Sequence, residues 1–186
     1  KKRSSALILL DLSAAFDTVD HNILIHRLVN YGLSACALLW LYAFLTGRAQ
    51  AVRMGGHMSP LAVLVYGVPQ GSALSPLLFN IYLQPLVASL ALMDCRVYNY
   101  ADDIQFLLQL DNFILSQSNA QAILRFINQW MNANSLKLNP DKTELLVVNA
   151  KLCPWLDVYW PPEIGAPPHR PWWSSASACS SMTACQ

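Results

Sequence analysis

Two adjacent aspartates, Asp102 and Asp103, separate two β-favouring runs at residues 97–100 and 104–108. Aspartate is depleted in strands and common in turns, so the pattern predicts a β-hairpin over about 96–109 with both carboxylates near its turn. Carboxylates held that close repel each other unless a cation neutralises them. Hard divalent ions bind through one or two carboxylates together with phosphates. The hairpin therefore predicts a metal site, and an exposed Asp-Asp turn is the alternative.

A third carboxylate, Asp11, follows a short apolar run that predicts a buried strand at about 5–11. A carboxylate at the end of such a strand lies at the sheet edge, where open α/β sheets place their ligands. The alternative for Asp11 is a solvated residue at a strand end. Asp17 and Asp20 fit local capping groups better than metal ligands, with Asp20 as the cap of the next helix.

Four segments resemble the motifs of a reverse transcriptase. They are residues 10–17 (LDLSAAFD, motif A), 68–79 (VPQGSALSPLLF, motif B), 100–103 (YADD, motif C) and 138–144 (LNPDKTE, motif D). The four occur in the family's order, and motifs A, B and D look like those of non-LTR (LINE-type) retrotransposons more than those of retroviruses. The resemblance covers roughly residues 4–149. It implies a polymerase palm that belongs to an RNA-directed DNA polymerase.

The resemblance also implies catalytic roles. Asp11 and Asp102 match the family's catalytic metal ligands, and Asp103 matches the third acidic position. Two Mg²⁺ ions about 3.5–4 Å from each other, with Mn²⁺ as the alternative, would hold the attacking 3′ hydroxyl and the leaving oxygen. Lys142 matches a lysine near the leaving pyrophosphate, where a cation donates a proton or stabilises developing phosphate charge. A solvated turn lysine is its alternative.

Three further residues match substrate-binding positions of the family. Phe16 matches the ring that stacks under the incoming sugar and excludes a 2′ hydroxyl by steric clash. Gln70 and Gly71 match residues that contact the incoming and template nucleotides, and Gly71 lets a ligand approach the backbone. Without the resemblance, Phe16 fits a core aromatic, and residues 69–72 fit a surface turn. The implied partners are an RNA template, a DNA primer and deoxynucleoside triphosphates.

Other kinds of site have little support. The sequence holds no Walker loop, no Gly-rich dinucleotide fingerprint and no His-Glu-x-x-His. The five cysteines form no Cys-x-x-Cys pair, so we expect no zinc site and a reducing intracellular compartment, with nucleus and cytoplasm undecided. We expect no signal peptide and no membrane span, because no apolar run reaches about 18 residues and the longest candidate, 33–45, fits a buried helix. His21 and His26 fit helix-surface or packing residues, and the oligomeric state stays undetermined.

Length and charge limit what this chain does alone. The 186 residues are 54% hydrophobic, which suffices for one domain with a real core, but the net charge is only +1. A polymerase that grips a primer and template needs strong basic patches. We therefore expect a basic fingers segment and a thumb to lie outside this sequence. The alternative is a catalytically inactive remnant with a folded palm that acts at most as a nucleic-acid- or protein-binding module.

The predicted fold is an α+β polymerase palm with helices on one face of its sheet and with incomplete fingers and thumb. The palm spans 1–149, with a partial fingers insertion at about 34–67. Besides the first strand and the hairpin, we expect strands at about 49–54, 61–67 and 143–149, and helices at about 21–31, 34–46, 73–92 and 117–133. A break in the third helix is expected at Pro85. A turn is expected at 139–141.

Residues 150–186 differ from the rest, since they hold six of the eleven prolines and four of the six tryptophans. Such a segment does not sustain regular helix or sheet, so we expect it to be irregular. We favour unselected sequence, such as a shifted reading frame, over a proline-rich ligand segment.

Overall fold

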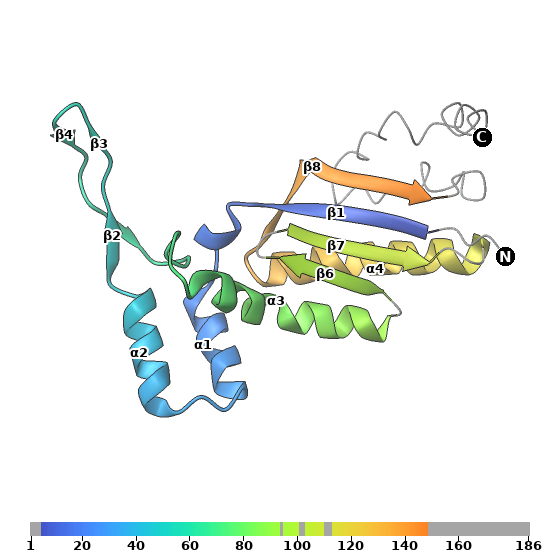
Figure 1. Ribbon diagram of the computed structural model, residues 1–186, viewed down its shortest axis with the longest axis horizontal. Helices are drawn as coiled ribbons and strands as arrows, with labels where there is room; N and C mark the ends of the chain where they lie inside the picture. The colour runs from blue at the N-terminus through green and yellow to red at the C-terminus, as the bar shows by residue number, and fades with distance from the viewer. Residues whose placement is uncertain (1–4, 94, 101–102, 110–112, 149–186) are drawn as a thin grey trace, which may run out of the picture.

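The computed structural model describes residues 5–93, 95–100, 103–109 and 113–148 (Figure 1). Two predictions lie outside these residues. One is the position of Asp102 at the hairpin turn, and the other is the irregular tail at 150–186.

A four-stranded antiparallel sheet forms the centre of the molecule, in the order β6-β7-β1-β8 (Figure 1). Its strands are β1 (Ser5–Ser13), β6 (Arg96–Tyr100), β7 (Asp103–Gln109) and β8 (Lys137–Val148). The predicted hairpin over 96–109 is confirmed, because the whole of β6 pairs with residues 103–107 of β7. The mixture of helices with an antiparallel sheet confirms the predicted α+β class.

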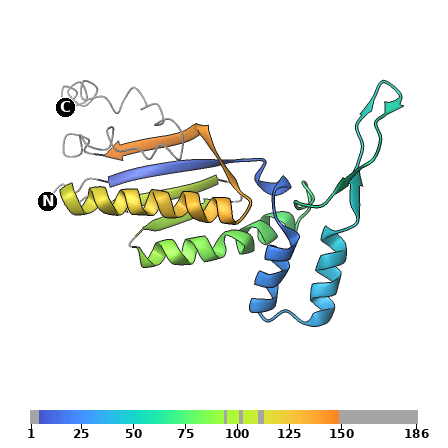
Figure 2. The same ribbon diagram turned by 180° about the vertical axis from the view of Figure 1, so that it is seen from behind.

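Two helices cover one face of this sheet, α3 (Ser75–Leu92) and α4 (Phe113–Ala133), as Figures 1 and 2 show from opposite sides. Side chains of β1 are alternately buried and half-buried, although its sequence reads as one continuous apolar run. Ile8 and Leu10 therefore face the helices, and Asp11 lies on the opposite, open face. β7 follows the same alternation, with Ile104 and Phe106 buried.

The third helix runs without interruption through Pro85, so the predicted break there is wrong. A proline removes one backbone hydrogen bond and crowds the preceding turn. Here buried leucines on both sides, Leu83 and Leu86, hold the helix against the core. By length and composition alone this helix could also cross a membrane, contrary to the expectation from the sequence. A core helix passes the same test, and α3 packs against α1 and β6.

The segment between β1 and α3 contains α1 (His21–Asn30), α2 (Ala35–Leu45) and an arm that projects away from the sheet (Figure 2). The two longer strands predicted at 49–54 and 61–67 are wrong in extent. The arm instead holds two short ladders, and they pair β2 (Arg48–Gln50) with β5 (Ala62–Leu64) and β3 (Arg53–Met54) with β4 (His57–Met58). Between them the Ser59 side chain replaces a backbone partner, since its Oγ accepts from the Val52 N–H at 2.9 Å.

The last strand begins earlier than predicted, at Lys137, and includes the residues expected to form a turn at 139–141. Its pairing with β1 is irregular there, because Asp11 pairs with Asn139 and Leu9 pairs with Glu144. The predicted turn is thus a bulge within a strand. The Thr143 hydroxyl stabilises it by donating to the backbone carbonyl of Asn139 at 2.8 Å.

Candidate active site

Asp11 lies on the open face of the sheet, with its side chain 25% exposed. The Asn139 side-chain amide donates to its Oδ2 atom at 3.1 Å. The Lys142 ammonium lies 3.6 Å from the same oxygen, and the lysine side chain is 69% exposed. The predicted motif A carboxylate and the predicted motif D lysine therefore meet across β1 and β8.

Asp103 is the first residue of β7 and is exposed. The pairing of β1 with β7 runs through Leu9 with Gln105 and Leu10 with Ile104, so one further step along each strand leads to Asp11 and Asp103. Both residues are on the open face, because side chains alternate along a strand. Within the described ranges, no group of three or more His, Cys, Asp or Glu side chains could hold a metal ion. The predicted third carboxylate, Asp102, falls outside those ranges.

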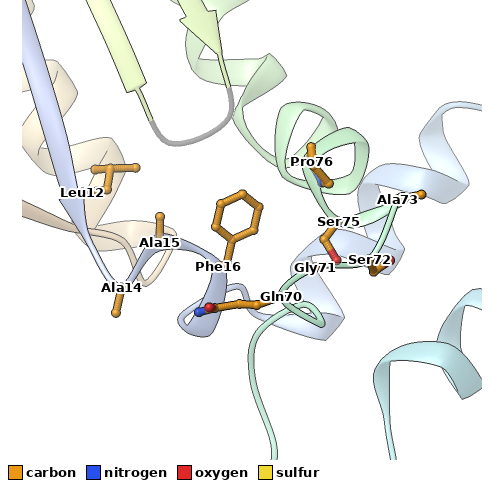
Figure 3. A pocket seen from close by; sticks show the side chains of 10 residues that line it. All are labelled: Leu12, Ala14, Ala15, Phe16, Gln70, Gly71, Ser72, Ala73, Ser75 and Pro76. Atoms are coloured by element: carbon orange, nitrogen blue, oxygen red, sulfur yellow. The ribbon is translucent and has the colours of Figure 1, made fainter.

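A pocket of about 580 Å³ lies between the end of β1, the 3₁₀ turn η1 (Ala15–Asp17) and the loop before α3 (Figure 3). It brings together residues of the predicted motifs A and B. Its lining residues are Leu12, Ala14, Ala15, Phe16, Gln70, Gly71, Ser72, Ala73, Ser75 and Pro76. Phe16, Gln70 and Gly71, which are predicted to bind substrate, therefore share one cavity.

Phe16 is half-buried, and its ring both packs against the core and lines the pocket. Its ring packs against Phe79 of α3, with ring centroids 5.1 Å apart and planes inclined by 38°. The same ring lines the pocket (Figure 3). Its backbone carbonyl accepts a hydrogen bond from the Val68 N–H at 2.7 Å. Phe16 is thus held through its ring and through its backbone.

The Gln70 side chain reaches η1, where its Nε2 atom donates to both carboxylate oxygens of Asp17 at 3.0 and 3.1 Å. The prediction that Asp17 is a local capping group is therefore wrong, because its partner is 53 residues away in the sequence. The predicted cap role of Asp20 is confirmed, since its Oδ1 accepts from the N–H groups of Asn22 and Ile23. Gly71 has a φ of +80°, which explains a glycine at this turn.

Gly67, which was not predicted from the sequence, lies against the turn that carries Phe16. Its φ is +84°, and an added Cβ would lie 2.8 Å from the Phe16 carbonyl oxygen. Its own carbonyl accepts hydrogen bonds from the buried His21 ring at 2.8 Å and from the Arg48 guanidinium. Its N–H donates to the Val19 carbonyl at 2.8 Å. Gly67 thereby joins α1 and the arm to the turn that carries Phe16.

A polar cluster connects α1, α3 and α4 with the residues that follow α4. The Arg27 guanidinium lies over the rings of Tyr82 and Trp130, 4.3 and 5.2 Å from their centroids, and donates to the Asn134 side chain. The Tyr82 hydroxyl donates to the Asn134 carbonyl at 2.8 Å. Burial lowers the pKa of Arg27 and raises the pKa of Tyr82 from their ordinary values.

The sequence model of the family described as reverse transcriptase (RNA-dependent DNA polymerase) matches residues 1–170. The chain belongs to the reverse transcriptase family. Two-metal catalysis is general for this family, whose members use divalent metal ions.

Curated relatives of this reverse transcriptase domain come from non-LTR retrotransposons. The probable RNA-directed DNA polymerase from transposon BS of Drosophila melanogaster is 31% identical over 147 residues, which are 73% of this chain and 16% of that protein. The polymerase from the mobile element jockey of Drosophila melanogaster is 28% identical over 72% of this chain and 15% of its own length. The Pol polyprotein of a type-1 element R2 from Popillia japonica is 28% identical over 76% of this chain and 24% of that protein. The chain therefore spans a minor part of these relatives.

Solved telomerases share the fold. Apo telomerase from Candida tropicalis, truncated from its C-terminal domain, aligns with 81% of this chain and 32% of its own, at a TM-score of 0.62 and 14% identity. The telomerase of the same species in complex with a fragment of telomeric RNA aligns with 80% of this chain and 26% of its own, at a TM-score of 0.62 and 15% identity. The reverse transcriptase domain thus has the palm-like architecture predicted from its sequence.

Proposed function

We propose that this chain is the palm of an RNA-directed DNA polymerase that copies a retrotransposon RNA by adding deoxynucleotides to the 3′ end of a DNA primer. The observation that carries the proposal is the arrangement on the open face of the sheet. Asp11 and Asp103 lie there on neighbouring strands, and the pocket lined by Phe16, Gln70 and Gly71 begins at the end of β1. We also propose that residues 1–149 form the palm, with 34–67 as a partial fingers insertion.

Magnesium is the ion that we propose for this site, with two ions held by Asp11, Asp102 and Asp103. The described donors fit such ions, because Asp11 and Asp103 offer carboxylate oxygens on an accessible face, and Mg²⁺ prefers oxygen ligands. When bound, the ions would stabilise charge on the attacking and leaving oxygens of an in-line displacement at the α-phosphate.

The chain's own residues would position the substrates and supply a proton. The Lys142 ammonium would donate a proton from Nζ to the leaving pyrophosphate, and its exposed side chain has the freedom to turn toward it. The Phe16 ring, held by Phe79, would lie under the incoming sugar and exclude a 2′ hydroxyl. Because Gln70 donates its amide N–H to Asp17, its Oε1 atom stays available to accept from a nucleotide.

Primer extension on an RNA template with Mg²⁺ tests this proposal. The chain is compared with Asp102→Ala, with Glu144→Gln as a matched carboxylate control on β8, and with a version that regains upstream fingers and a downstream thumb from a relative. We expect extension that disappears in Asp102→Ala and persists in Glu144→Gln. Extension only by the version with fingers and a thumb would mean that the palm needs these two parts to act.

A catalytically inactive remnant is the second candidate, and the low net charge of +1 favours it. If neither version extends the primer, while circular dichroism shows both to be folded, the polymerase proposal fails and the remnant stands. Binding of the RNA–DNA primer–template, measured by fluorescence anisotropy, then decides whether the remnant still binds nucleic acid.

A further inference from the structure

The bulge in β8 changes which residue faces Asp11. Leu9 pairs with Glu144, and a regular antiparallel ladder continued from that pair would place Lys142 opposite Asp11. Instead Asn139 pairs with Asp11. Leu10 alone, between the two paired residues of β1, therefore stands opposite residues 140–143 of β8. Lys142 nevertheless stays within 3.6 Å of the carboxylate. The bulge therefore adds a neutral amide to Asp11 while it keeps the lysine close.

Both groups contact the same carboxylate oxygen. The Asn139 amide donates to Oδ2 of Asp11 at 3.1 Å, and the Lys142 ammonium lies 3.6 Å from that atom. The carboxylate group is planar and rigid, so a hydrogen bond that fixes Oδ2 also fixes the direction in which Oδ1 points. Oδ1 is then the atom that a cation would bind.

The Asn139 and Lys142 side chains differ in how firmly each is held beside Asp11. Asn139 is half-buried, and its backbone carbonyl accepts from Thr143, a residue with only 4% exposure. Lys142 has a long side chain that is 69% exposed and carries a charge that competes with a metal ion. The amide is thus a fixed partner, whereas the ammonium is able to leave.

We propose that Asn139 is a positioning residue, which orients the Asp11 carboxylate toward its metal ion throughout the reaction cycle. The proposal rests on the proposed function of Asp11 as a metal ligand. When Lys142 turns away toward a phosphate, the Asn139 contact keeps Oδ2 in place, so that Oδ1 stays directed at the metal. Loss of a hydrogen bond from a neighbouring side chain to a metal-binding carboxylate typically changes metal affinity or activity by about 10–100-fold.

Mn²⁺ binding to the full chain, followed by electron paramagnetic resonance without nucleotides, tests this role independently of polymerisation. We expect Asn139→Leu, which has a similar volume and no donor, to weaken Mn²⁺ binding about tenfold. Thr143→Val, which removes the hydroxyl that pins the bulge, should weaken binding less. Lys142→Met should strengthen binding, because it removes a competing cation. Thermal unfolding is measured alongside to confirm that each variant is folded.

Opposite effects of Asn139→Leu and Lys142→Met support the positioning role, because a merely structural defect would not separate them. Unchanged affinity in a folded Asn139→Leu variant overturns it. Asp11→Asn is the reference, and Mn²⁺ binding that does not depend on Asp11 also overturns it. Failure of primer extension with Asn139-dependent Mn²⁺ binding intact would instead reject the polymerase function and leave the positioning role standing.

Discussion

The central sheet and the projecting arm are both rich in apolar residues, yet they use them differently. Strands β1 and β7 bury every second side chain against α3 and α4. The strands of the arm bury none of their residues, and Val52 and Val63 are 71% and 72% exposed. The difference shows that apolar composition alone does not make a core. A second layer is required, and within the described residues only the sheet has one.

Truncations in the two regions should therefore have very different effects on stability. Phe106 in β7 is fully buried, and Phe106→Ala should lower the free energy of unfolding by about 3–5 kcal/mol, because it leaves a cavity under the sheet. Val63→Ala in β5 should change it by less than about 0.5 kcal/mol. Urea unfolding followed by circular dichroism measures both. Equal losses would mean that the arm has a core of its own.

Two glycines, Gly67 at the junction of the two regions and Gly55 in the arm, sharpen the same comparison. Gly67→Ala places a Cβ 2.8 Å from the Phe16 carbonyl oxygen at a φ of +84°, and it should destabilise the chain by more than about 2 kcal/mol. Gly55→Ala in the arm also has a positive φ, +54°, but an added Cβ meets nothing within 4 Å. It should cost about 1 kcal/mol, from backbone strain alone. Thermal unfolding of the pair separates steric clash from strain.

The turn that carries Phe16 lies at the junction of the two regions. If the proposed function holds, Phe16→Val should raise the use of ribonucleotides relative to deoxynucleotides by about 10–200-fold, as removal of steric exclusion in a pocket typically does. Single-nucleotide incorporation kinetics in a chain completed with fingers and thumb measure this ratio. Phe79→Leu is the control, because it loosens the packing of Phe16 without removing its ring. An unchanged ratio in Phe16→Val would argue against a role in sugar selection.

The polar cluster around Arg27 and Tyr82 should produce a small effect on stability and a pH dependence. Tyr82→Phe removes the hydrogen bond to the Asn134 carbonyl and should cost about 1 kcal/mol. Burial raises the pKa of Tyr82 in the folded chain, so the protonated hydroxyl stabilises the fold below the ordinary tyrosine pKa of about 10, and this contribution is lost as pH rises through the raised value. Urea unfolding from pH 8 to 11 should show a shallower alkaline loss in Tyr82→Phe. An identical loss of unfolding free energy in the unchanged chain and in Tyr82→Phe would contradict a contribution from the Tyr82 hydroxyl.

Features set by local chemistry could be predicted from the sequence. The hairpin over 96–109 follows from two β-favouring runs around an Asp-Asp pair, and the Asp20 cap follows from one side chain at a helix start. The resemblance to reverse transcriptase motifs assigned both Phe16 and Gln70 to substrate binding, and the two residues line one pocket. The roles assigned to these residues remain predictions.

Features set by distant partners could not be predicted. The hydrogen bond between Gln70 and Asp17 spans 53 residues, and that between His21 and Gly67 spans 46. The residues at 139–141 have turn chemistry, and only the neighbouring strand β1 turns them into a bulge. Pro85 has a strong local preference for a break, which the packing of α3 overrides.

The alternation of side chains along β7 decides two things together: which residues form the core and which way Asp103 points. A slip of one residue in its pairing with β1 would turn Ile104 and Phe106 outward and point Asp103 into the helices. Such a misregistered chain would lose its core and bury a charge at once, and both changes cost free energy. The slipped register is therefore less stable than the native one, so the strand pairing that forms the core also fixes the direction of the Asp103 carboxylate.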